Sequence, residues 1–257
     1  MTIKYTLLGS GSSLGVPRPD GYFGNCDPRE KKNYRTRCSF LISSKIKNII
    51  IDTSPDLRMQ LLNNKVKNIN AVFYTHYHAD QTHGINDLRV FFLKNKKKIP
   101  VYSDIQTKKF LFTSFKYCFN DFKEYPSICK HFKLKKIHLF DSKKNKIKIQ
   151  YLKVKHGLID ALGYLINDNC AYISDVNEIY EEELKKLRNL KYFVVDCLRF
   201  KEHSSHFNLN QVLNIIKYLK PKKTILTNLH SDIDYNKLKI KLPKNIVPGY
   251  DGLSFYI

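Results

Sequence analysis

The sequence lacks the features that mark membrane-spanning, exported and disulfide-rich proteins. No stretch of the 257 residues approaches the roughly 18 consecutive apolar residues that a transmembrane helix needs. The first residues carry one Lys and a short apolar run, which predicts a strand turning at Gly9 and Gly11 and not a signal peptide. The six Cys are scattered and form no Cys-x-x-Cys pair, which favours reduced thiols and a cytoplasmic location.

Acidic residues are scarce, with 23 Asp and Glu against 45 Lys and Arg, so the net charge is +22. This balance leaves room for a polyanionic partner such as RNA, because Lys and Arg neutralise phosphates. The basic residues are mostly Lys, and Ile and Asn are also abundant, a bias that an AT-rich genome produces regardless of function. A small phosphorylated substrate would need only a few local cations, so the charge leaves both kinds of partner open.

No Pro-, Gly- or Ser-rich linker and no internal repeat divides the chain, and 42% of its residues are hydrophobic. We therefore expect a single domain over residues 1–257. Short β-branched or aromatic runs alternate with helical patterns along the chain. Strands are predicted at 3–9, 38–42, 48–53, 70–75, 99–104, 146–154, 161–166, 170–175, 191–200, 222–229 and 252–257. Helices are predicted at 54–64, 85–94, 105–119, 177–189, 208–219 and 235–242, and loops with short strands at 120–145. This order indicates an α/β fold of two sheets packed face to face with helices outside.

Three potential metal ligands follow the apolar strand at 70–75. His76, His78 and Asp80 occupy alternate positions, so an extended or tightly turned segment would place them on one side. Imidazole and carboxylate ligands suit Zn²⁺, Mn²⁺ or Fe²⁺. A lone His on a strand is usually a surface or core residue, but this grouping favours a metal site.

Further candidate ligands stand at the ends of later strands. His156 follows the strand at 146–154, and Asp175 ends the strand at 170–175. Asp52 ends another strand, and we interpret its carboxylate as a cap for the helix that starts near Pro55.

These motifs resemble the metallo-β-lactamase superfamily. The resemblance runs nearly end to end, and it is carried above all by "THYHADQTHGINDLR", with "LLGSGSSLGVPRP", "IIIDTSPDLR", "YISD", "VVDC", "HFNLNQVL", "ILTNLHSD" and "YDGLSF". Within the superfamily, the chain is similar to the branch of the phosphoribosyl 1,2-cyclic phosphate phosphodiesterases and more distantly to tRNA 3′-processing endonucleases (tRNase Z). The resemblance implies an αββα sandwich of two mixed sheets, with two metal ions at the sheet edge.

The resemblance also implies a ligand set. His76, His78 and His156 would hold the first metal, Asp175 would bridge both metals, and Asp80 would hold the second. The family pattern completes the second site with a His directly after the Asp and another His after the strand that here reads "ILT".

This chain departs from the pattern at both of those His positions. Gln81 and Asn228 stand there instead, and amides are poorer ligands than imidazole. Three outcomes stay open: a second site shifted onto His83 and His230, a single metal, or a weak second site that uses the amides. One or two ions of Zn²⁺ or Mn²⁺ are therefore expected. The loop at 18–33 offers only Cys26, so we expect no structural zinc there.

The polar segment at 202–209 contributes a candidate acid. In the resembled phosphodiesterases a His here acts near the leaving group, and His206 is the matching position. An imidazole suits this task because its pKa lies near neutral pH. Asp80 is expected to orient the attacking water, and Asn208 is expected to cap the helix that follows.

The function that we expect is hydrolysis of a phosphodiester or cyclic phosphate in a small molecule by metal-bound hydroxide. An RNA endonuclease like tRNase Z is the first alternative; the high charge favours it, but the long Gly-rich basic arm of such nucleases is missing. A non-catalytic binding protein with a decayed second metal site is the other alternative. A small phosphorylated substrate is the expected partner, with RNA less favoured, no membrane, and a homodimer left open.

Overall fold

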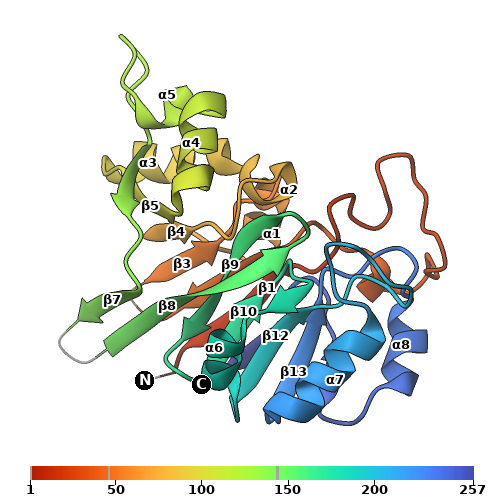
Figure 1. Ribbon diagram of the computed structural model, residues 1–257. Helices are drawn as coiled ribbons and strands as arrows, with labels where there is room; N and C mark the ends of the chain where they lie inside the picture. Colours follow the sequence, from red (N-terminus) through yellow and green to blue (C-terminus); the bar gives the residue numbers. More distant parts are fainter. Residues whose placement is uncertain (1, 46, 143–144) are drawn as a thin grey trace. The chain divides into compact units, whose positions relative to one another are not determined.

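The structure is a computed structural model that describes residues 2–45, 47–142 and 145–257. It divides into two compact units, each built from separate stretches of the chain. Unit one comprises the chain up to Gly9, Arg37–Leu134 and Gly252–Ile257, and unit two comprises Ser10–Thr36 and Lys135–Asp251. Each unit contains one mixed β-sheet with its own helices (Figure 1). The expected α/β class with two mixed sheets is confirmed, whereas the single domain over 1–257 stays a prediction.

The sheet of unit one has the strand order β15-β1-β2-β3-β4-β5-β6. Its strands are β1 (Lys4–Gly9), β2 (Ser39–Ser43), β3 (Asn48–Ile51), β4 (Ala71–Phe73), β5 (Ile99–Ser103), β6 (Cys129–Lys133) and β15 (Ser254–Tyr256). Its helices are α1 (Leu57–Asn63), α2 (Ala79–Thr82), α3 (Arg89–Asn95), α4 (Ile105–Ser114) and α5 (Lys116–Phe119), with a 3₁₀ turn η2 (Ile85–Leu88). Strands β3 to β6 are parallel, so their carboxyl ends meet at one edge of the sheet.

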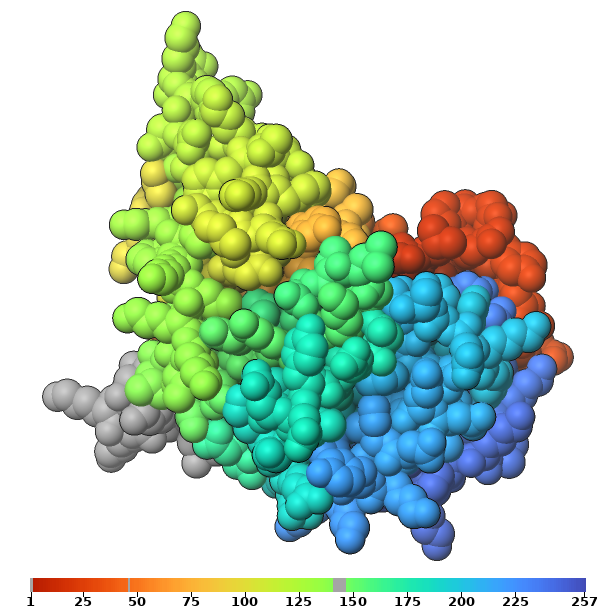
Figure 2. Space-filling model, viewed as in Figure 1, coloured from red at the N-terminus to blue at the C-terminus, as the bar shows by residue number. Residues whose placement is uncertain are grey.

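The core of unit one explains why β3 and β4 read as continuous apolar runs. Val72 and Val101 of the central strands pack with Phe91 of α3, Leu111 of α4 and Cys118 of α5. A parallel strand covered by helices needs apolar residues along its length and not the alternation of a half-exposed strand. Figure 1 shows α3, α4 and α5 gathered beside β4 and β5, and Figure 2 shows the same segment, in yellow to yellow-green, at the surface.

The sheet of unit two has the strand order β11-β8-β9-β10-β12-β13-β14, and β7 also pairs with β8. Its strands are β7 (Ile137–Ser142), β8 (Asn145–His156), β9 (Ile159–Ile166), β10 (Cys170–Ile173), β11 (Glu178–Ile179), β12 (Tyr192–Asp196), β13 (Lys223–Thr227) and β14 (Ile246–Pro248). Its helices are α6 (Glu181–Leu184), α7 (Leu209–Leu219) and α8 (Tyr235–Lys241), with 3₁₀ turns η1 (Lys31–Asn33) and η3 (Lys185–Leu187). Strands β10, β12, β13 and β14 are parallel.

Helix α7 is the clearest case of an element specified by local sequence. Asn208 accepts a hydrogen bond from the backbone N–H of Gln211, and the Gln211 side chain accepts one from the backbone N–H of Asn208. This capping box satisfies two of the N–H groups that a helix start leaves without partners. The apolar face of α7, with Val212 and Ile216, packs into the core of unit two. The predicted cap at Asn208 is confirmed.

The helices predicted at 54–64, 85–94, 105–119, 208–219 and 235–242 all contain helix in the structure. The segment at 177–189 differs, because Glu178–Ile179 pairs with β8 before a short helix begins at Glu181. Strand pairing to a neighbour distant in sequence overrides the helical pattern at that point. The region at 120–145 contains the strands β6 and β7, as expected, and residues 143–144 lie outside the described part of the chain.

Two further observations concern the whole chain. Among the described helices, none has the length and hydropathy that crossing a bilayer requires. All six Cys are buried and free in the structure.

Candidate metal centre

The first group of predicted ligands lies in unit one, directly after the parallel strand β4. His76 and His78 stand in the extended segment between β4 and α2, and their ring centroids are 4.5 Å apart. His78 is the N-cap of α2, with φ −61° and ψ 153°, so the backbone turns into a helix immediately after it. Asp80 then falls in the first turn of α2. The predicted convergence of alternate residues therefore holds for the two imidazoles.

The buried side chain of Asp52 orients this loop. Its carboxylate accepts hydrogen bonds from the backbone N–H of Thr75, at 2.8 Å, and from the Thr75 hydroxyl, at 2.9 Å. Since the hydroxyl proton points at Asp52, Thr75 Oγ1 accepts from Nδ1–H of His76 at 3.0 Å. The predicted helix cap at Asp52 is wrong, because this carboxylate supports the loop and the N-cap of α1 is Asp56. The arrangement places the proton of His76 on Nδ1 and the lone pair on Nε2, the tautomer that a metal ligand needs.

The two polar residues after Asp80 have distinct surroundings. The buried side chain of Gln81 donates from Nε2 to Asp80 Oδ2 at 3.2 Å. His83, three residues after Asp80, shares a hydrogen bond of 3.1 Å with the Thr82 hydroxyl, and its ring packs edge-on against Phe115.

The second group of predicted ligands lies along one edge of the sheet in unit two. His156 ends β8, and Asp175 lies two residues after β10. Asp196, which was not among the predicted ligands, ends β12 at the same edge. The residue after β13 is Asn228. Strand β8 runs in the same direction as β10, because each is antiparallel to β9. All four side chains therefore come from the carboxyl ends of parallel strands, where open sheets characteristically bind ligands.

The His156 imidazole is held by a neighbouring loop. Its Nδ1–H donates to the backbone carbonyl of Ser205 at 2.8 Å, which leaves the lone pair on Nε2. Gly157, at φ 59°, permits this close approach, because a Cβ at that position would lie 2.9 Å from Ser205 Cβ. Burial lowers the pKa of His156 below its usual 6.5, although Asp175 opposes the shift. A neutral imidazole is the form that binds a metal.

His206 lies next to these groups and is paired with a buried acid. Its Nδ1 is 2.7 Å from Asp196 Oδ2, and ligand atoms of His156, Asp175 and His206 lie within 4.8 Å of one another. Complete burial raises the pKa of Asp196 to about 6, although His206 opposes the shift. We assign the shared proton to Nδ1, so that Asp196 fixes the ring orientation of His206.

The roles of Asp196, Thr75 and Ser205 were missed from the sequence. Asp196 carried a usable signal, since an Asp that ends a buried apolar strand needs a partner to compensate its desolvation. Ser205 acts through its backbone carbonyl, which no side-chain pattern reveals.

Asn228 is buried and turns its amide nitrogen toward two oxygen atoms. Nδ2 donates to the backbone carbonyl of Ser174 at 2.9 Å, and it lies 3.2 Å from Asp175 Oδ1. His230 is half-buried, and its Nδ1 lies 3.3 Å from the carboxylate and the backbone nitrogen of Asp232.

The donor groups in each unit fit a divalent metal ion. They consist of imidazoles whose Nδ1 atoms are held by oxygen acceptors and of carboxylates at strand ends. Such mixed nitrogen and oxygen sets suit Zn²⁺, Mn²⁺ and Fe²⁺, and oxygen partners on the remaining ring nitrogen are typical of metal-binding His. In unit two the structure brings together His156, Asp175 and His206.

Comparison with known proteins agrees with this chemistry. Residues 47–228 match the beta-lactamase superfamily domain. A curated relative from Porphyromonas gingivalis, named octanoyltransferase, is 32% identical over 261 residues, which cover 99% of this chain and 52% of that protein. The chain thus spans about half the length of this relative.

Solved structures agree with the family match. The crystal structure of a diphosphatase from the PhnP family superposes with a TM-score of 0.88 at 29% identity, covering 100% of this chain and 98% of that chain. The short form of human tRNase Z gives a TM-score of 0.68 at 14% identity over 98% of each chain, a likeness of fold alone. The superfamily is largely hydrolytic, and its fold implies binding of divalent metals. The chain, with its two mixed sheets and its strand-end His and Asp residues, belongs to the beta-lactamase superfamily.

Proposed function

We propose that this protein is a metal-dependent phosphodiesterase that hydrolyses a phosphodiester or cyclic phosphate of a small molecule. The observation that carries the proposal is the hydrogen bond between His206 and buried Asp196. A ring nitrogen of His206 also lies within 4.8 Å of ligand atoms of His156 and Asp175. The pair of His206 and Asp196 places a proton donor beside the strand-end ligands, as cleavage of an ester with a basic leaving group requires. The similarity to a PhnP-family diphosphatase over the whole chain supports a phosphorus-containing substrate.

The metal ligands in this proposal are those expected from the sequence. His76, His78, His156 and Asp175 would hold a divalent ion, Zn²⁺ or Mn²⁺. The ion, when bound, offsets negative charge on the phosphate and lowers the pKa of water. Asp80 orients the attacking water.

The protein side chains handle the proton of the leaving group. His206 in its protonated form keeps Nδ1–H on Asp196 and presents Nε2–H to the leaving oxygen. The bond between phosphorus and that oxygen breaks as the Nε2 proton moves onto it. Asp196 stabilises the imidazolium before the transfer and holds the ring in place afterwards.

We further propose that a single metal ion is bound. The amide nitrogen of Gln81 contacts the carboxylate of Asp80 at 3.2 Å, and that of Asn228 contacts the carboxylate of Asp175 at 3.2 Å. An amide nitrogen that donates to a carboxylate is not itself a metal ligand, and its N–H gives the carboxylate a neutral hydrogen-bond partner. Each expected ligand of the second ion thus has a neutral partner instead of a second imidazole.

A comparison of two esters tests the acid role of His206. With metal-loaded protein, we expect His206→Ala to lower kcat on an alkyl phosphodiester by about 10²- to 10⁴-fold, the usual contribution of a general acid. A nitrophenyl ester should lose much less, because its leaving group departs without a proton. His203→Ala is the matched control, since His203 lies in the same loop but has no contact with Asp196 among the described interactions.

The outcomes separate the proposal from its alternatives. Equal losses on both esters would remove the acid role of His206. Cleavage of precursor tRNA, with alkyl, cyclic and diphosphate esters untouched, would replace the small substrate by RNA. Absence of metal-dependent cleavage of any of these substrates would favour a binding protein.

Octanoyl transfer is not assigned to this chain. The relative that bears this name is about twice as long, so its activity can reside in the half that the chain does not match.

A further inference from the structure

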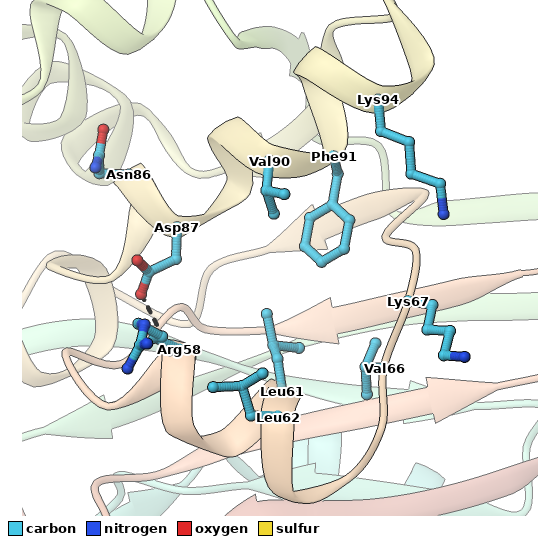
Figure 3. Close-up of a pocket in the computed structure, with 10 residues that line it drawn as sticks. All are labelled: Arg58, Leu61, Leu62, Val66, Lys67, Asn86, Asp87, Val90, Phe91 and Lys94. Atoms are coloured by element: carbon cyan, nitrogen blue, oxygen red, sulfur yellow. Dashed lines mark hydrogen bonds between the residues drawn. The ribbon is translucent and has the colours of Figure 1, made fainter.

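Unit one contains a groove that uses none of the strand-end ligands. One wall is α1 with the segment that follows it, and the other is η2 with α3 (Figure 3). The cavity measures about 560 Å³, a size typical of small-molecule sites.

The middle of the groove is apolar. Leu61 and Phe91 form its base and are only 6% and 5% exposed. Leu62 and Val90 are 59% and 58% exposed, and Figure 3 shows them on facing walls. An apolar chain between these walls would remove both side chains from water, which is a favourable change.

The polar groups divide between the two ends of the groove. Figure 3 shows Lys67 and Lys94 together at one end, and Arg58 and Asp87 at the other. The Asp87 carboxylate accepts a hydrogen bond from the backbone N–H of Arg58 at 3.0 Å. Asp87 is the one acidic residue among the described lining residues, so the end with the two lysines is purely cationic.

The cationic end is held in place by neighbouring residues. Asn95 Nδ2 donates to Asn68 Oδ1 at 2.9 Å, which ties the residue after Lys94 to the residue after Lys67. The two lysine backbones therefore come from segments fixed to each other.

A second hollow of about 310 Å³ continues from this end and shares Val66 and Lys67 with the groove. Lys4 and Lys65 also line it, and its described lining contains no carboxylate. The cationic end of the groove thus borders a second hollow lined by further lysines.

We propose that this groove binds an amphiphile with an unbranched hydrocarbon chain and a phosphate head group. The chain lies between Leu62 and Val90, and the phosphate lies beside Lys67 and Lys94. The two lysines complement an anionic head in charge, and the exposed Leu62 and Val90 offer apolar contacts to the hydrocarbon chain. The proposal goes beyond the phosphodiesterase activity and does not depend on it.

Calorimetric titration with decyl phosphate, below its micelle-forming concentration, tests the proposal. We expect decyl phosphate to bind at least tenfold tighter than each of three control compounds. Decanol lacks the phosphate head, inorganic phosphate lacks the hydrocarbon chain, and decyltrimethylammonium carries a positive head group instead. Shortening the chain from decyl to octyl should weaken binding roughly five- to tenfold, as expected for two methylenes that leave a partly open apolar site.

Two pairs of variants locate the site. Lys67→Glu with Lys94→Glu should weaken decyl phosphate binding at least tenfold, whereas Lys222→Glu with Lys223→Glu, the same charge change on exposed residues of unit two, should not. Val90→Asp should also abolish binding, while Leu93→Asp, on the same helix but outside the groove, should not. Both substituted residues are exposed, so melting temperatures should confirm that the variants fold.

The proposal is overturned if decyl phosphate binds no tighter than inorganic phosphate or decanol. It is equally overturned if the folded variants Lys67→Glu with Lys94→Glu and Val90→Asp bind as the unaltered protein does. An acidic amphipathic peptide that binds the groove when decyl phosphate does not would indicate a protein partner instead.

Discussion

At the scale of single residues, Gln81 and Asn228 are the departures with the largest expected consequence. They are almost 150 residues apart in sequence, and each places an amide nitrogen 3.2 Å from a carboxylate expected to bind the second metal. The amide N–H gives each carboxylate a neutral hydrogen-bond partner in place of a second cation. Gln81 and Asn228 therefore both favour a single bound metal ion.

We expect the purified protein to hold about one divalent ion per chain, and Gln81→His with Asn228→His to hold about two. The added imidazoles would supply nitrogen ligands next to Asp80 and Asp175, which suit Zn²⁺ better than amides do. Elemental analysis after dialysis against trace Zn²⁺ measures the stoichiometry, independently of any activity.

The control is Asn120→His with Asn210→His, which adds one His to an exposed position of each unit and should leave the metal content at one. Two ions bound by the unaltered protein, or one ion bound by Gln81→His with Asn228→His, would contradict the single-metal proposal.

At the scale of elements, the parallel strands position the candidate site residues at their carboxyl ends. Side chains on the outer strands connect the sheet to the helices. His131 of β6 is one such link. Its Nε2 shares a hydrogen bond of 3.0 Å with the Ser103 hydroxyl of β5, and its ring lies edge-on to Phe112 of α4. Burial lowers the pKa of His131 from its usual 6.5 to about 4, with a further contribution from Lys108.

This shift predicts a dependence of stability on pH. Between pH 6.5 and 4 the unfolded chain binds a proton at His131 that the folded chain does not, so stability is lost as the pH falls through this window. We expect the melting temperature of His131→Gln to fall less than that of the unaltered protein between pH 7 and pH 5. Calorimetry at both pH values measures the difference.

Lys130→Gln provides the comparison, because Lys130 is an exposed neighbour on the same strand. The pH dependence of Lys130→Gln should match that of the unaltered protein. If the melting temperatures of His131→Gln and the unaltered protein fall equally between pH 7 and pH 5, His131 does not contribute to the pH dependence of stability.

At the scale of the whole molecule, a buried Arg connects distant parts of the chain within unit two. Arg35 is 2% exposed and donates to Asn33 Oδ1 at 2.9 Å, to the Ile233 carbonyl at 2.8 Å and to the His230 carbonyl at 3.3 Å. Gly11 makes room for it, because a Cβ there would lie 2.9 Å from Arg35 Cβ. The loop before β2 is thereby bound to the segment after β13.

We expect Arg35→Ala to lower the free energy of unfolding by about 3 kcal/mol, since it opens a cavity and leaves buried carbonyl groups without donors. Urea denaturation measures this loss. Arg29→Ala is the matched control in the same loop, where the side chain is 91% exposed and pairs with Asp27. Its effect should be far smaller, as for most surface substitutions. Equal effects of the two variants would show that the buried network does not stabilise unit two.

The sequence allowed much of the fold to be predicted, for reasons that act over short distances. Apolar runs bounded by turn residues located β4 and β10, and the capping box at Asn208 located the start of α7. The segment at 177–189 was predicted less well, because Glu178–Ile179 pairs with β8, more than 20 residues earlier. A helical pattern contains no information about such a partner.

The candidate site, like the fold, could be predicted only in part from the sequence. By itself, the sequence determined which residues offer imidazole and carboxylate groups at strand ends, since His76, His78, Asp80, His156 and Asp175 all follow apolar runs. Only the tertiary structure decided which atoms of these groups are held by partners. The hydrogen bonds from Thr75 to Asp52, from His156 to Ser205 and between His206 and Asp196 join residues that are distant in sequence. The orientation of Thr75 toward Asp52 then makes its hydroxyl oxygen the acceptor for the adjacent His76. Hydrogen bonds are short and directional, so the tautomers and orientations of the site are properties of the folded chain.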